Sequence, residues 1–197
     1  MNTKLKLITV LDEHKRGVHL RELSRQVKTG LPNIVRNVSI LEKEGVVMKQ
    51  KDGNLVKVML KQGQKTTAYL KQVNTEKFLS LPKKVQYAVQ DLINDLDVKP
   101  LLTLIFGSYA KGSYTSVSDI DILLVFQKVE DEKQIKNSAK KISMRTNTLL
   151  SPIYLDYKNF ETNFLDKEHD FSKEIRRQVI IMSGVELYYS LLWRFLK

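Results

Sequence analysis

The sequence has 197 residues, 42% of them apolar, which is long and apolar enough to bury the core of one large domain or two small ones. This composition excludes disordered and fibrous proteins. The 33 Lys and Arg residues exceed the 22 Asp and Glu residues, so the net charge of +11 favours an anionic partner such as a nucleic acid, a nucleotide or a membrane surface. The absence of cysteine excludes disulfides and thiolate metal sites and fits a reducing compartment.

The apolar segments of the chain are short. The run Leu7–Leu11 is shorter than the apolar region of a signal peptide, and no stretch approaches the roughly 20 apolar residues of a membrane-spanning helix. We therefore expect a soluble, cytoplasmic protein. A membrane surface is the least favoured anionic partner, because no predicted helix joins a basic face to a broad apolar one.

The first third of the chain carries over half of the excess positive charge, with 13 Lys and Arg against 6 Asp and Glu in residues 1–62. Apolar residues at helical spacing predict helices around Leu5–Leu11 and Leu20–Val27, and a third from Pro32 to Gly45. The segments 46–50 and 55–60 are β-prone and flank an Asp-Gly turn, which predicts a hairpin. These elements together predict a basic module of three helices and a hairpin.

The segment LRELSRQVKTGLPNIVRNVSILEKEGVVMKQKDGNLVKV resembles the winged helix-turn-helix domains of prokaryotic transcription regulators. In that family the third helix enters the major groove of DNA and the wing touches the backbone. The resemblance implies base contacts by Asn33, Arg36 and Asn37, and phosphate contacts by Lys43, Lys49, Lys51 and Lys57. The alternative is a solvated basic surface on a domain used for dimerisation or protein contacts.

Residues 64–99 are predicted to be a helical connector, with a break at Leu81-Pro82 and a helix after it. The expected organisation is therefore a winged-helix domain over residues 1–63, the connector, and a second domain over residues 100–197. We place the boundary between the two halves near residue 80.

The residues that suggest chemistry begin after this connector. A continuous apolar strand, 101–106, ends in Gly107-Ser108, and a second strand follows over 120–126. Gly107 allows the close approach of an anion, the Ser108 hydroxyl can donate a hydrogen bond to it, and Lys111 adds positive charge. This pattern predicts a phosphate-binding turn.

Two carboxylates, Asp119 and Asp121, follow the turn at positions i and i+2, so an extended strand directs both to the same face. Like charges side by side repel unless a cation neutralises them, and carboxylate oxygens are ligands that Mg²⁺ prefers. The turn and the acid pair together predict a site for a magnesium ion and a nucleotide. Taken separately, the Gly-Ser pair is equally typical of an ordinary turn, and the Asp-x-Asp pair of a solvated strand edge.

The segment GSYAKGSYTSVSDID is similar to the signature Gly-Ser, ten residues, Asp-x-Asp of minimal nucleotidyltransferases in the DNA polymerase beta-like superfamily. The resemblance implies transfer of a nucleoside monophosphate from a nucleoside triphosphate to a hydroxyl, with two magnesium ions held by three carboxylates on a mixed sheet. It assigns triphosphate binding to Gly107 and Ser108 and metal binding to Asp119 and Asp121, and Lys111 stands where the family often has a basic residue.

The third carboxylate departs from the family pattern. The predicted strand 151–155 is followed directly by Asp156, whereas the family pattern places the third acid within such a strand. Asp156 is therefore a candidate catalytic residue and metal ligand, and its position equally suits the N-cap of a helix through Phe160 and Phe164. Further on, an apolar stripe from Phe171 to Met182 predicts a helix that ends at Gly184, and the tail VELYYSLLWRFLK predicts a strand plus a final helix.

The predicted fold is thus α+β, with a winged helix-turn-helix domain followed by a mixed-sheet nucleotidyltransferase domain flanked by helices. The predicted function is a magnesium-dependent nucleotidyltransferase that binds DNA, with a protein hydroxyl, RNA or a small molecule such as an aminoglycoside as the acceptor. A protein acceptor is what the resemblance to antitoxin-type members implies. The alternative is a transcription regulator whose second domain is a nucleotide sensor or an inactive dimerisation unit, and whether the chain forms a homodimer stays open.

Overall fold

The computed structural model describes residues 2–197 and divides the chain into two compact units, one ending at Glu76 and the other spanning Lys77–Lys197. Helix α4 (Gln64–Leu79) contains the division, and α5 (Lys83–Asp95) packs into the core of the second unit. The segment 64–99, predicted to be a separate connector, is therefore divided between the two units.

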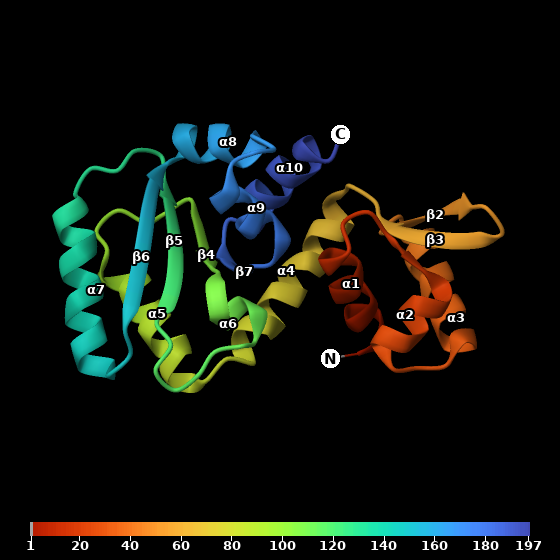
Figure 1. Cartoon of the computed structure of the whole chain (residues 1–197), viewed down its shortest axis with the longest axis horizontal. Helices are drawn as coiled ribbons and strands as arrows, with labels where there is room; N and C mark the ends of the chain where they lie inside the picture. Colours follow the sequence, from red (N-terminus) through yellow and green to blue (C-terminus); the bar gives the residue numbers. More distant parts are fainter. Residues whose placement is uncertain (1) are drawn as a thin grey trace. The chain divides into compact units, whose positions relative to one another are not determined.

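The first unit combines three helices with a three-stranded antiparallel sheet (Figure 1). All three predicted helices are present, as α1 (Thr3–Glu13), α2 (Leu20–Val27) and α3 (Leu31–Lys43). The predicted hairpin is formed by β2 (Val47–Asp52) and β3 (Leu55–Leu60). A two-residue strand that was not predicted, β1 (Val18–His19), pairs with β3, so the strand order is β1-β3-β2.

Helix α3 ends as its sequence predicts. Gly45 adopts a left-handed backbone with φ +77°, and its N–H donates to the Glu42 carbonyl oxygen at 2.9 Å. The next N–H, of Val46, donates to the Leu41 carbonyl oxygen at 2.9 Å. These bonds satisfy the last carbonyl groups of the helix and turn the chain into β2, so this glycine sets where the hairpin begins.

The second unit is built on a four-stranded sheet of order β6-β5-β4-β7 (Figure 1). Its strands are β4 (Leu102–Ile105), β5 (Ile120–Phe126), β6 (Leu150–Asp156) and β7 (Ile180–Ser183). Strand β4 is antiparallel to both β5 and β7, whereas β5 and β6 are parallel. The predicted mixed sheet flanked by helices is thus confirmed for this unit.

Helices cover both faces of this sheet. Helices α5 and α7 (Glu132–Thr146) pack on one face, against Ile105, Ile122 and Leu124. Side chains alternate along each strand, so Leu123 and Val125 project to the opposite face, where α8 (Tyr157–Leu165) and α10 (Val185–Phe195) contact β5 and β4. Leu123 and Val125 are both fully buried, so β5, an inner strand of the sheet, is covered on both faces.

The carboxyl-terminal elements differ from the prediction. The predicted helix through Met182 ends early, as α9 (Asp170–Arg177), and is followed by β7. The tail predicted as a strand plus a helix is helical throughout, as α10. The reason is tertiary, because Ile180–Ser183 pairs with the otherwise free edge of β4, and no local pattern in the sequence reports that edge. Among residues 2–197, no helix is long and apolar enough to cross a membrane.

Candidate functional site

The topology of the sheet brings the Gly-Ser turn and the two aspartates together. Strands β4 and β5 are antiparallel, with Ile105 opposite Ile122, and the Phe106 N–H donates to the Asp121 carbonyl oxygen at 3.1 Å. The residues between the strands, including the short helix α6 (Gly107–Lys111), therefore form a return connection whose two ends meet at one edge of the sheet. The Gly-Ser turn and the two aspartates, separated by ten residues in the sequence, therefore lie next to each other in the structure.

Gly107 lies directly against the carboxylate of Asp121. Its backbone is left-handed, with φ +65°, and a Cβ at this position would overlap Oδ2 of Asp121 and lie 2.9 Å from its Cγ. Both the conformation and the close approach require glycine. The carboxylate of Asp121 is therefore held over the exposed backbone of the turn.

Asp119 is held from the neighbouring strand. Strand β6 runs parallel to β5 with Ser151 beside Asp121, and the Ser151 hydroxyl donates to Oδ2 of Asp119 at 2.8 Å. By strand alternation, Ser151 and both aspartates share one face of the sheet. No local signal in the sequence marks Ser151, because only the β5–β6 register brings it to the acid pair.

Burial and nearby acids raise the pKa of Asp121. Desolvation is the largest cause, and the charges of Asp119 and Glu174 act in the same direction, while Lys111 lowers the pKa. Lys111 forms an ion pair with Glu174 at 2.6 Å. Negative charge is thus concentrated beside the Gly107 turn, which is the electrostatic setting of a cation site.

Helix α9 forms a side wall of this site that the sequence analysis missed. Phe171 packs edge-on against Phe106 with ring centroids 5.4 Å apart, Glu174 holds Lys111, and the Gln178 side chain donates to the Ala110 carbonyl oxygen at 3.0 Å. Phe171 and Glu174 lie one turn apart on α9, and Gln178 directly follows the helix, so the three contacts fasten α9 and its carboxyl-terminal end to α6. The sequence analysis noted only the apolar stripe of this segment.

Asp156 is not brought to the other two acids, which corrects the expected carboxylate triad. It lies beside Phe126 at the far end of the parallel pair, five residues beyond Ser151 or about 16 Å along the strand. Phe126 is part of the core under α5 and α7, so Asp156 also faces away from Asp121. Its carboxylate accepts a hydrogen bond from the Val129 N–H at 2.6 Å, and it occupies the N-cap position of α8 without a side-chain cap bond. Asp156 therefore ties a loop to the sheet.

The remaining predicted residues of this site lie on the turn. The Ser108 side chain is half-buried, and its hydroxyl has no hydrogen-bond partner among residues 2–197, so it is available to a ligand. Lys111 is partly exposed at the end of α6, where it is held by Glu174. The structure thus groups Gly107, Ser108 and Lys111 with the acid pair.

In the first unit, the residues predicted to contact bases share the amino-terminal half of α3. Asn33 and Arg36 are exposed, and the Asn37 side chain donates to the Asn33 carbonyl oxygen at 2.8 Å. Lys43 is exposed at the last turn of the helix. These four residues therefore lie on one helix, as expected.

The lysines of the hairpin are divided between two surfaces. On β2, Lys49 and Lys51 lie opposite Val58 and Val56 and project to the face of the sheet on the α3 side. There Lys49 forms an ion pair with Glu42 at 2.6 Å. Lys57 lies on the opposite face of β3, where its Cγ approaches Gly17. Lys57 is therefore not on the surface that α3 shares with Lys51.

Comparisons with known proteins agree with this geometry. The profile of the family described as "Nucleotidyltransferase domain" matches residues 88–181, which include the turn, both aspartates and Ser151. A protein of Methanocaldococcus jannaschii, named as a candidate protein adenylyltransferase, is 31% identical over 75 residues, which cover 36% of this chain and 75% of the relative. This chain belongs to the nucleotidyltransferase family.

Two solved structures are also similar to this nucleotidyltransferase. One is a toxin-antitoxin with AMP-PNP, at 17% identity and a TM-score of 0.39, covering 58% of this chain and 82% of the other. The second is a candidate nucleotidyltransferase from Sulfolobus solfataricus, at 25% identity and a TM-score of 0.29, covering 45% of this chain and 78% of the other.

The acid pair of this nucleotidyltransferase fits a magnesium ion that is completed by a substrate. Among residues 2–197, no three His, Cys, Asp or Glu side chains are grouped to hold a metal by themselves. Mg²⁺ is commonly held by one or two carboxylates plus substrate phosphates, so two aspartates beside a phosphate-accessible turn suffice. Burial first, and then the charge of Asp119, raises the pKa of Asp121, and a cation bound between the two carboxylates would offset both effects.

Removing the hydroxyl of Ser151 is expected to weaken this nucleotidyltransferase without inactivating it. Ser151→Ala deletes the hydrogen bond that orients Asp119, and a bond to a charged group contributes about 1.5 kcal/mol, or roughly a ten-fold lower transfer rate. Ser151→Thr keeps a hydroxyl at this strand position and is the matched control. The measurement is the steady-state transfer rate, and a rate for Ser151→Ala equal to that of the native protein would show that Asp119 is oriented by other contacts.

Proposed function

We propose that this nucleotidyltransferase transfers a nucleoside monophosphate from a nucleoside triphosphate to a hydroxyl group, with magnesium. The apposition of Gly107 and the Asp121 carboxylate, with Asp119 on the same face, carries this proposal. In this arrangement, a phosphate bound at the Gly107 turn would lie next to the carboxylate oxygens that can bind a metal ion.

In this proposal Asp119 and Asp121 hold Mg²⁺, which when bound lowers the pKa of the acceptor hydroxyl and neutralises charge on the α-phosphate and on the departing pyrophosphate. The backbone at Gly107 and the Ser108 hydroxyl hold the triphosphate. Lys111 adds positive charge beside it, and Ser151 orients Asp119 through its hydrogen bond. Each protein group positions or polarises a reactant and none forms a covalent bond to it.

For the acceptor we propose a protein hydroxyl, with ATP as the nucleotide. The support is the name of the archaeal relative, a candidate protein adenylyltransferase. RNA and small molecules such as aminoglycosides are the competing acceptors. Incubation of the chain with each α-labelled triphosphate, Mg²⁺ and a cell lysate, followed by identification of the labelled product, tests all of these at once. Labelled protein with ATP is the expected result, and label in RNA or in a small molecule would replace the proposed acceptor.

A second candidate function is nucleotide sensing by a regulator that has lost catalysis. It is favoured by the position of Asp156 and by the presence of Ser151, and not an acid, beside Asp121. The number of metal ions bound with a non-hydrolysable triphosphate separates the two functions. Two ions per chain together with turnover indicate the transferase, whereas tight nucleotide binding with no labelled product indicates the sensor.

We infer that the first unit is a winged helix that binds DNA. Its support is the order of the three helices, the hairpin and the sheet, together with exposed Asn33 and Arg36 on α3 and Lys51 on the wing. The excess of positive charge in residues 1–62 suits a polyanion. The solvated basic surface remains the competing interpretation, and salt dependence distinguishes them.

Affinity for duplex DNA is expected to fall steeply with salt. Each neutralised phosphate contributes a slope of about −0.9 to the plot of log K against log salt, so four contacts lower the affinity by roughly two orders of magnitude between 50 and 200 mM. Lys51→Ala should reduce the slope by about one, because this lysine has no acidic partner among residues 2–197. Lys57→Ala, on the other face of the sheet, is the control and should leave the slope unchanged. Fluorescence anisotropy at four salt concentrations measures both slopes, and an affinity independent of salt would contradict DNA binding.

A further inference from the structure

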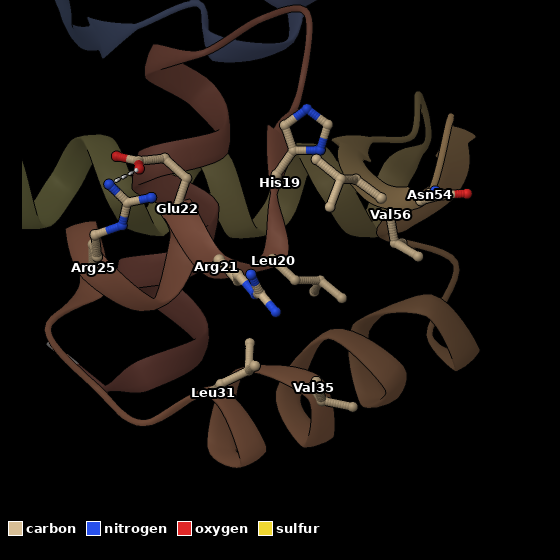
Figure 2. A pocket seen from close by; sticks show the side chains of 10 residues that line it. His19, Leu20, Arg21, Glu22, Arg25, Leu31, Val35, Asn54 and Val56 are labelled. Atoms are coloured by element: carbon tan, nitrogen blue, oxygen red, sulfur yellow. Dashed lines mark ion pairs between the residues drawn. The ribbon is translucent and has the colours of Figure 1, made fainter.

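A hollow of about 650 Å³ lies in the first unit between α2, α3 and the strand β3 (Figure 2). Its walls are mainly apolar: Leu20 comes from α2, Leu31 and Val35 from α3, and Leu55 and Val56 from β3. Leu31, Val35 and Leu55 are 38%, 42% and 50% exposed. The hollow is therefore an apolar surface that the first unit leaves open to a ligand.

This surface is separate from the core of the unit. Helix α3 already buries a complete apolar face through Ile34, Val38 and Leu41, each with no exposed area. Leu31 and Val35, one helical turn apart, form a second apolar stripe on the same helix. The core of the unit is complete with the first apolar face of α3, so the second stripe does not contribute to it. Contiguous exposed apolar residues of this kind commonly mark a contact site.

The charged residues at this hollow favour an anionic partner. Arg21 and Arg25 on α2 are both exposed and line it, and its single acid, Glu22, is paired with Arg25 at 3.1 Å. Arg21 has no acidic partner among residues 2–197. Figure 2 shows the Arg21 side chain lying between Leu20 and α3, across the hollow from Val35. The partner must therefore combine negative charge with small apolar groups.

Duplex DNA that contains thymine has this combination. In the major groove the C5-methyl group of thymine is the one apolar feature of the base edges, and the flanking phosphates carry the negative charge. We propose that Leu31 and Val35, with Val56 on the wing, receive thymine methyl groups while Arg21 binds a phosphate, so that the first unit selects thymine-rich DNA. This inference rests on the proposed DNA binding and specifies which sequences it favours.

Two duplexes of one alternating A·T sequence test the proposal, the second with deoxyuridine in place of every thymidine. The substitution removes only the methyl groups and keeps every hydrogen-bonding group of the base pair. Because each buried methyl group is worth about a four-fold change in affinity, the full-length chain should bind the thymine duplex about fifteen-fold more tightly if two methyl groups are held. Anisotropy titrations at one low salt concentration measure the ratio.

Variants then locate the contact. Leu31→Ala and Val35→Ala are each expected to lower the thymine-to-uracil ratio to about four-fold, and the double variant Leu31→Ala/Val35→Ala to lower it to near unity, while keeping the salt slope. Both side chains are exposed, so the fold should persist, which circular dichroism checks. Met48→Ala is the matched control, because Met48 is 44% exposed on β2 and lies on the face away from α3. It should leave the ratio unchanged.

Equal affinity of the native chain for the two duplexes would overturn the inference and leave the proposed DNA binding intact. Binding of neither duplex would overturn both. A labelled peptide of alternating Glu and Leu provides the protein-partner alternative. If that peptide binds, loses affinity in Val35→Ala and is not displaced by either duplex, the hollow is a protein-docking surface and the inference is wrong.

Discussion

Asp121→Asn is expected to abolish nucleotide transfer while leaving the fold intact. The substitution removes the charge that would bind Mg²⁺ but keeps the size of the side chain that lies over Gly107. The loss of a carboxylate that neutralises charge in the transition state should lower the rate by about a thousand-fold, or about 4 kcal/mol. The measurement is the transfer of label from α-labelled ATP, and normal turnover by this variant would refute the assigned site.

The same substitution should stabilise the protein at neutral pH. The pKa of Asp121 is raised, mainly by burial and then by Asp119 and Glu174, so the folded chain holds the Asp121 proton more tightly than the unfolded chain does. Ionisation as the pH rises through the raised pKa therefore costs the native protein stability, a cost that Asn does not have. The melting temperature of Asp121→Asn should exceed that of the native chain at pH 7, and the difference should vanish as the pH falls below the pKa of an unperturbed aspartate.

Asp156→Asn is the matched control for both measurements. It makes the same chemical change in an acid that lies on the opposite face of the sheet, and its amide oxygen can still accept the hydrogen bond from the Val129 N–H. Transfer should proceed at the native rate. A loss of activity as large as that of Asp121→Asn would restore Asp156 to the catalytic residues.

Gly107→Ala is the second substitution with a large expected effect. A Cβ here would overlap Oδ2 of Asp121, so the carboxylate must move, and a misplacement of about 1 Å in a catalytic group costs about a hundred-fold in rate. The left-handed backbone adds about 1–2 kcal/mol of destabilisation. Transfer rate and thermal unfolding are the two measurements.

Gly112→Ala separates the two effects. Gly112 also has a left-handed backbone, with φ +69°, but a Cβ there would meet nothing within 4 Å. It should lose the same stability as Gly107→Ala and keep most of the activity. If the two variants lose activity equally, the damage comes from backbone strain in the connection and not from displacement of Asp121.

The local patterns of the chain predicted most of its elements. Gly45 ends α3 because a left-handed glycine can close a helix wherever it occurs, and the Asp-Gly turn folds the hairpin by short-range geometry. The sequence likewise predicted the buried strand before Gly107 and the shared face of Asp119 and Asp121. In each case the decisive interaction lies within a few residues of the signal.

The errors occurred where a distant partner decides. Ile180–Ser183 carries an apolar pattern that suits a helix or a strand, and it becomes β7 because β4 offers a free edge. Asp156 is the first acid after the predicted strand, but its register beside Phe126 turns it to the other face and moves it along the sheet. Side-chain direction on a strand reverses with each residue, so a register that the sequence does not specify decides which face a residue serves.

By itself the sequence determined the chemistry available to this nucleotidyltransferase: a Gly-Ser turn that a phosphate can approach, two acids on one face of a strand, and a basic first unit. Only the tertiary structure decided which residues meet. The antiparallel pairing of β4 with β5 placed Gly107 against Asp121. The parallel register of β6 placed Ser151 beside Asp121 and placed Asp156 at the far end of the strand pair. The reason is that residue types and local spacing are properties of short segments, whereas strand pairing is settled by the packing of the whole unit.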